Sequence, residues 1–140
     1  MRPIAVGGLV AVGFVDERRV FVGSHSGVVI VDALSGEPTD RAADVDGSYE
    51  WFTESPPSGS WADVDGPHTV PVAGLWGGDL PVETSDGWLI EGDGQGAKVT
   101  GPDGVTIAVK DDEEVRALGF SPEGRLVIYA TSSTLYIAAR

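Results

Sequence analysis

The sequence predicts an all-β protein in which three similar antiparallel units form a single domain. Short apolar stretches alternate along the chain with turn-forming clusters, and glycine and proline account for 20 and 9 of the 140 residues. Uninterrupted helical periodicity is nearly absent. In addition, Leu9–Asp32 aligns without a gap with Val115–Ala138, 106 positions later. A repeated pattern of this size indicates a supersecondary unit that is used more than once.

The first unit covers about residues 4–38. Its predicted strands, in order, are Ile4–Val15, Val20–Gly23 and Val28–Asp32. Polar and glycine-containing segments separate these strands, and such residues favour tight turns.

Residues 39–67 stand outside the repeat and form an acidic, aromatic insert. Ordinary connections have roughly 2–6 residues, and much longer ones are often functional. The proline- and glycine-containing stretch Pro56–Ser60 interrupts regular structure. We therefore expect partner contacts here first, at Tyr49, Trp51, Phe52, Trp61, Asp44, Asp46, Glu50, Glu54, Asp63 and Asp65. Aromatic anchors in an acidic surround suit a protein interface, although Trp51 and Trp61 could instead plug the end of the domain.

The middle unit, about residues 68–100, is more degenerate. Val22–Gly36 aligns with Val82–Gly96 at a shift of 60 positions, and Ser85–Gly87 is a hairpin signal. Trp76 ends a predicted strand and aligns by unit position near Phe14 and Phe120, which predicts that it lies in the core.

The last unit, about residues 105–140, repeats the order of the first. It contains predicted strands at Val105–Lys110, Val115–Phe120, Leu126–Thr131 and Leu135–Ala139. In the turn Ser121–Gly124, proline at the second position and glycine at the fourth suit a type I turn. Because the first and last units are the most alike, we expect the chain ends to pair.

Two segments of these units resemble WD40-type β-propeller blades. Gly119–Leu126 (GFSPEGRL) is similar to the turn between the first and second strands of a blade, and Val28–Glu37 (VVIVDALSGE) to the third strand and its exit turn. The Trp-Asp and Gly-His dipeptides of the family are absent. Over about half the chain, the resemblance implies degenerate blade-like units in a compact propeller-like or barrel-like domain. Because propellers typically have 4–8 blades, the alternative is a homodimer in which two chains share one ring.

The charge of the chain excludes some partners and favours others. With 22 acidic and 9 basic residues, the net charge is −13. Such a field repels nucleic acids and anionic membranes and attracts basic proteins. The absence of cysteine excludes disulfides and thiolate chemistry. Ile4–Val12 is shorter than the roughly 20 residues of a membrane-spanning helix, and we expect a cytoplasmic protein.

Two other kinds of chemistry have weaker signals. The Ala-Asp-Val-Asp-Gly motif occurs at residues 43–47 and 62–66, but a calcium site needs about six oxygen ligands, so turns are the expected role. His25 can be combined on paper with neighbouring serines and with Asp32 or Asp16. No nucleophile elbow accompanies this set, so no catalytic residue, metal or cofactor is predicted.

The expected function is therefore that of a non-enzymatic interaction module that binds a basic protein. One concrete form is an immunity or inhibitor protein that covers a basic toxin or nuclease. A calcium-, sugar- or small-ligand-binding β module is the alternative, and a hydrolase built around His25 is the most remote one.

Overall fold

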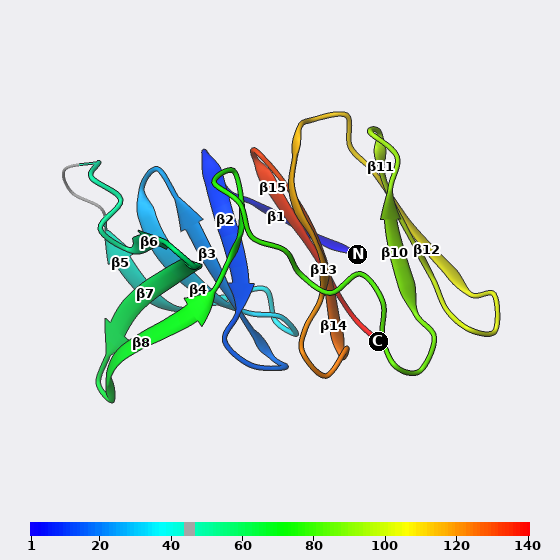
Figure 1. The fold of residues 1–140 in the computed structure, drawn as a ribbon, viewed down its shortest axis with the longest axis horizontal. Helices are drawn as coiled ribbons and strands as arrows, with labels where there is room; N and C mark the ends of the chain where they lie inside the picture. Colours follow the sequence, from blue (N-terminus) through cyan, green and yellow to red (C-terminus); the bar gives the residue numbers. More distant parts are fainter. Residues whose placement is uncertain (44–46) are drawn as a thin grey trace.

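A computed structural model describes residues 1–43 and 47–140, and the described residues form four antiparallel β-sheets without a helix (Figure 1). The predicted all-β class is confirmed. Within the same residues, no helix is long and apolar enough to cross a membrane.

Fifteen strands make up these sheets. They are β1 (Arg2–Ala5), β2 (Leu9–Phe14), β3 (Arg19–Ser24), β4 (Gly27–Asp32), β5 (Pro38–Ala43), β6 (Phe52–Glu54), β7 (Pro57–Asp63), β8 (Gly66–Pro71), β9 (Ala73–Gly74), β10 (Leu89–Gly92), β11 (Gly96–Thr100), β12 (Thr106–Lys110), β13 (Val115–Phe120), β14 (Leu126–Thr131) and β15 (Thr134–Ala139). The strand orders are β6-β7-β8, β5-β4-β3-β2-β9, β1-β15-β14-β13 and β10-β11-β12.

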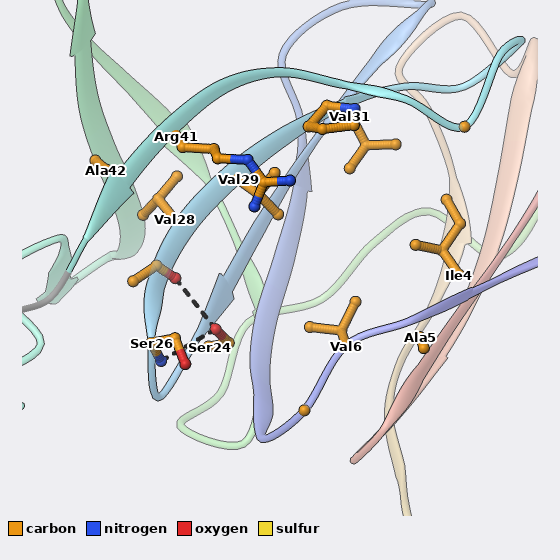
Figure 2. Close-up of a pocket in the computed structure, with 14 residues that line it drawn as sticks. Ile4, Ala5, Val6, Ser24, Ser26, Val28, Val29, Val31, Arg41 and Ala42 are labelled. Carbon is orange, nitrogen blue, oxygen red and sulfur yellow. Dashed lines mark hydrogen bonds between the residues drawn. The ribbon is translucent and has the colours of Figure 1, made fainter.

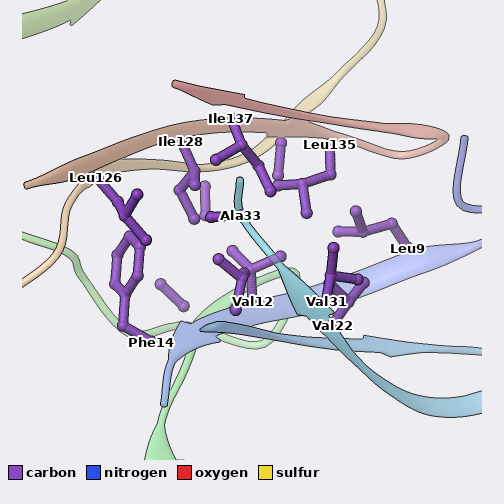
Figure 3. Packing of buried hydrophobic residues seen from close by; sticks show 14 residues of the cluster. Leu9, Val12, Phe14, Val22, Val31, Ala33, Leu126, Ile128, Leu135 and Ile137 are labelled. Carbon is purple, nitrogen blue, oxygen red and sulfur yellow. The ribbon is translucent and has the colours of Figure 1, made fainter. Parts of the chain in front are cut away.

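The four sheets lie side by side in a row, in the order just given (Figure 1). A separate cluster of buried apolar side chains joins each neighbouring pair. The largest cluster joins the two central sheets and includes Val12, Val22, Ile128 and Ile137 (Figure 3). The core thus consists of three successive apolar layers between the sheets. The turns of the two central sheets lie at the two opposite ends of their strands (Figure 1).

The two central sheets share details of register as well as strand order. β2, β3 and β4 pair in sequence, as do β13, β14 and β15. A register shift falls between Leu9 and Ala11 in one sheet and between Val115 and Ala117 in the other, at positions that correspond in the alignment of the two units. β1 pairs with β15, so the chain ends pair as the sequence predicts.

The sheet boundaries differ from the expected units in the middle of the chain. Residues 39–67 supply most of β5 as well as β6 and β7, so most of this insert is regular strand. Residues 68–100 are divided, because β8 pairs with β7 whereas β10 and β11 pair with each other and β12. In the 60-position alignment, β4 falls on β10, yet β4 lies inside its sheet and β10 at an edge. The two aligned strands therefore hold different places in their sheets.

The Glu17 carboxylate links the two central sheets at one end through hydrogen bonds. Glu17, in the β2–β3 turn, accepts hydrogen bonds from the Ser121 hydroxyl and from the amides of Glu123 and Arg125, the last two at 3.0 and 3.1 Å. Burial by itself would raise the pKa of Glu17, but these hydrogen bonds outweigh it and lower the pKa. The turn of one sheet therefore satisfies donors in the turn of the next.

Candidate partner-binding surface

Trp76 lies at the tip of a two-residue turn. The amide of Gly74 donates to the carbonyl of Gly77 at 3.1 Å, and the reciprocal bond measures 3.2 Å. Gly77 has a φ of 104°, which favours glycine. The two residues of the turn, Leu75 and Trp76, are 45% and 41% exposed. The prediction that Trp76 lies in the core is therefore wrong, because the chain reverses direction immediately after β9.

Two aromatic rings hold the indole of Trp76 in place. The Tyr49 ring meets it edge-on with centroids 4.9 Å apart, and the Phe52 ring lies at 5.0 Å. Tyr49 has a φ of 54°, which is uncommon for a bulky residue. Its hydroxyl is hydrogen-bonded to Nδ1 of His25, in the β3–β4 hairpin. We call Tyr49, Phe52, Leu75 and Trp76 the aromatic patch.

Trp51 and Trp61 lie beneath this surface, in the layer between the β6–β8 and β2–β5 sheets. Each is only 7% exposed, and their ring centroids lie 5.8 and 5.6 Å from that of Phe21. Gly23 faces the Trp51 ring and Gly59 faces the Phe21 ring, so closely that an added Cβ would overlap the ring in both places. Neither indole N–H has a hydrogen-bond partner among the described residues. In this structure, both residues have the plugging role that the sequence left open, and neither is an exposed anchor.

The acidic residues of the expected site are divided between two places. Glu50 and Glu54 are exposed and adjoin the aromatic patch in sequence. Asp44 and Asp46 lie outside the described residues. Only part of the predicted set therefore lies together with the exposed aromatic rings.

Asp63 and Asp65 lie in the β7–β8 hairpin, away from the patch. Phe52 pairs with Gly59, and β7 runs on from Gly59 to Asp63, which is about 13 Å at ~3.3 Å per residue. Nε2 of His68 and the amide of Asp65 both donate to Oδ1 of Asp63 at 2.8 Å. The hydrogen bond from His68, followed by that from the Asp65 amide, lowers the pKa of Asp63. Asp63 thus stabilises its own hairpin.

The catalytic arrangement around His25 is not formed. Asp32 is at the far end of β4 from the His25 hairpin, where it accepts a hydrogen bond from Arg18 at 2.8 Å. Asp16 pairs with Arg19 in the β2–β3 turn, also at that far end. Among residues 1–43 and 47–140, no group of three or more histidine, cysteine or acidic side chains is placed to hold a metal.

Comparisons with protein-family models, curated proteins and solved structures gave no match. The geometry of the chain itself therefore carries the functional argument. Sequence reasoning missed Leu75 and Trp76, although the spacing of Gly74 and Gly77 around them was an available signal for a tight, exposed turn.

Proposed function

We propose that this protein is a non-enzymatic interaction module that captures a basic protein through the aromatic patch. The observation that carries the proposal is Trp76, which is 41% exposed at a turn tip although Tyr49 and Phe52 contact its ring. Tryptophan and tyrosine are enriched among the residues that dominate binding energy at protein interfaces. The supported ring loses little freedom on binding, which favours affinity.

Charge supports a basic partner. The net charge of −13 attracts cations at long range, and the exposed Glu50 and Glu54 adjoin Tyr49 and Phe52 of the patch in sequence. Electrostatic complementarity of this kind accelerates association and selects partners. An immunity or inhibitor protein covering a basic toxin or nuclease in the cytoplasm is one concrete form of the proposal.

The relation to WD40-type propellers is part of this proposal. The equal strand order and the matching register shifts of the two central sheets support degenerate blades. The pairing of β1 with β15 also supports it, since it joins the two chain ends in one sheet. Blade-like stacks present their turns at two ends, and the aromatic patch lies at the end of the β3–β4 hairpin, where the Tyr49 hydroxyl is hydrogen-bonded to His25.

Affinity capture with matched variants tests the proposed surface. The immobilised protein is exposed to lysate at low salt, and retained proteins are identified by mass spectrometry and by their isoelectric points. We expect a basic protein whose retention falls at least about tenfold in Trp76→Ala and severalfold in Leu75→Ala, as expected for anchor residues. Retention should also fall with salt, because exposed charges are screened.

Two controls lie away from the patch. Leu34→Ala removes a leucine that is at least as exposed, 54% against 45% for Leu75, and should leave retention unchanged. The charge reversals Glu50→Lys and Glu54→Lys test the acidic residues of the proposed surface. Their control is Glu91→Lys, which reverses the charge of an exposed residue in β10. Equal losses in the patch and control variants would contradict the proposal, as would retained proteins that are all acidic.

A further inference from the structure

An apolar groove separates the edge strand β1 from β5, the edge strand of the neighbouring sheet, and from β4 beside it (Figure 2). Ile4 and Val6 line one wall, and Val29 and Val31 line the other. Its volume is about 390 Å³, within the ~300–1,000 Å³ typical of small-molecule sites. The groove exists because the two sheets meet through their inner strands, and the outer strands are left partly uncovered.

Arg41 is the charged residue of this groove. It lies directly opposite Val29 in the β4–β5 register, and residues opposite each other share a face of the sheet. Figure 2 shows its guanidinium extending from β5 over Val29. An exposed cation thus borders the valine and isoleucine side chains of the groove, whose lining also includes the hydroxyl-bearing Ser24 and Ser26.

Within residues 1–43 and 47–140, no ion pair neutralises Arg41. None of the described residues that line the groove is an aspartate or glutamate, and no described carboxylate forms an ion pair with Arg41. By contrast, Arg18 and Arg140 are paired with Asp32 and Asp86 at 2.8 Å. In a chain with 22 acidic residues, a groove whose described lining carries an arginine and no carboxylate is electrostatically suited to an anion.

We propose that the groove binds a linear hydrocarbon chain that ends in a carboxylate. The chain lies along the valine and isoleucine side chains, where burial of apolar surface stabilises it. The carboxylate pairs with the planar guanidinium of Arg41, which matches its two oxygens. This site is on the opposite face of the β2–β5 sheet from the aromatic patch, since Val29 packs with the cluster of the central sheets. The inference is therefore independent of the proposed function.

Titration with octanoate, followed by methyl NMR, tests the site. n-Octanol has the chain without the charge, and acetate has the charge without the chain. We expect octanoate to shift the methyl signals of Ile4, Val29 and Val31 and to bind about tenfold or more tightly than either control, as expected for a charge-assisted contact added to apolar burial.

Variants distinguish the contact between the carboxylate and Arg41 from nonspecific apolar binding. Arg41→Gln should weaken octanoate binding about tenfold and leave n-octanol binding unchanged, which also shows that the groove remains folded. Lys98→Gln removes an exposed cation on β11 and should change neither. Equal affinities for octanoate and n-octanol would overturn the proposal. So would an unaffected Arg41→Gln, or shifts confined to other methyl groups.

Discussion

Replacing Gly59 with alanine should destabilise the layer between the β6–β8 and β2–β5 sheets. The added Cβ would lie 2.3 Å from Cζ of Phe21, 2.5 Å from Cε1 and 3.0 Å from Cε2. Carbon atoms in contact normally lie about 3.5–4.0 Å apart. The ring or the strand must therefore move by roughly 1 Å.

The magnitude follows from how tightly Phe21 is enclosed. Its side chain is fully buried at 0% exposure, and Trp51 and Trp61 pack against it. Overpacking a core lowers the free energy of unfolding by about 1–3 kcal/mol. Because the Phe21 ring has no open space to move into, we expect a loss near ~3 kcal/mol for Gly59→Ala. Gly7→Ala is the matched control, because no atom lies within 4 Å of its added Cβ. That control should change the free energy of unfolding by less than about 0.5 kcal/mol.

Urea denaturation, followed by tryptophan fluorescence, measures these free energies of unfolding. Phe21→Leu removes the ring atoms that the new methyl group would strike. In a double-mutant cycle, Phe21→Leu should therefore offset about 1–2 kcal/mol of the loss caused by Gly59→Ala. Strictly additive losses, or a Gly59→Ala loss no larger than that of Gly7→Ala, would refute the packing argument.

Three further predictions concern the turns and the core. Gly23→Ala should cost about 1–3 kcal/mol in urea denaturation, because its Cβ would lie 2.3 Å from the Trp51 ring. Glu17→Gln should lower the free energy of unfolding by about 1–2 kcal/mol. This value is at the low end for hydrogen bonds to a charged group, because solvent screens the site. Hydrogen bonds from the Ser35 amide and the Arg18 side chain lower the pKa of Asp32 from 3.8 to about 2. Its stabilising contribution is therefore complete above pH ~4 and is lost as the pH falls toward 2, so Asp32→Asn should flatten that part of the acid denaturation curve.

Most of the strands in the first and last units were predictable from sequence. Their short apolar runs and the turn residues between them, as in Ser121–Gly124, are signals that act over a few neighbouring positions. The pairing of the chain ends was predicted from the similarity of these units. The middle of the chain was harder, because turn signals identify a hairpin without identifying the sheet that it joins. β7 and β8 therefore form one sheet across the boundary that the sequence predicts between the insert and the middle unit.

The candidate surface was predicted only in part. Tyr49 and Phe52 contact the exposed Trp76, whereas Trp51 and Trp61 are buried against Phe21. Composition reveals that a segment is aromatic and acidic, but burial depends on which sheet covers it.

The sequence by itself determined the all-β class, the local turns and the strongly acidic charge, because backbone preference, periodicity and composition are local properties. Only the tertiary structure decided that Trp76 is exposed, that Gly23 and Gly59 receive aromatic rings, and that Arg41 overlies an apolar groove. Those properties arise where residues distant in sequence meet. They depend on how the four sheets are stacked and on where their outer strands remain uncovered.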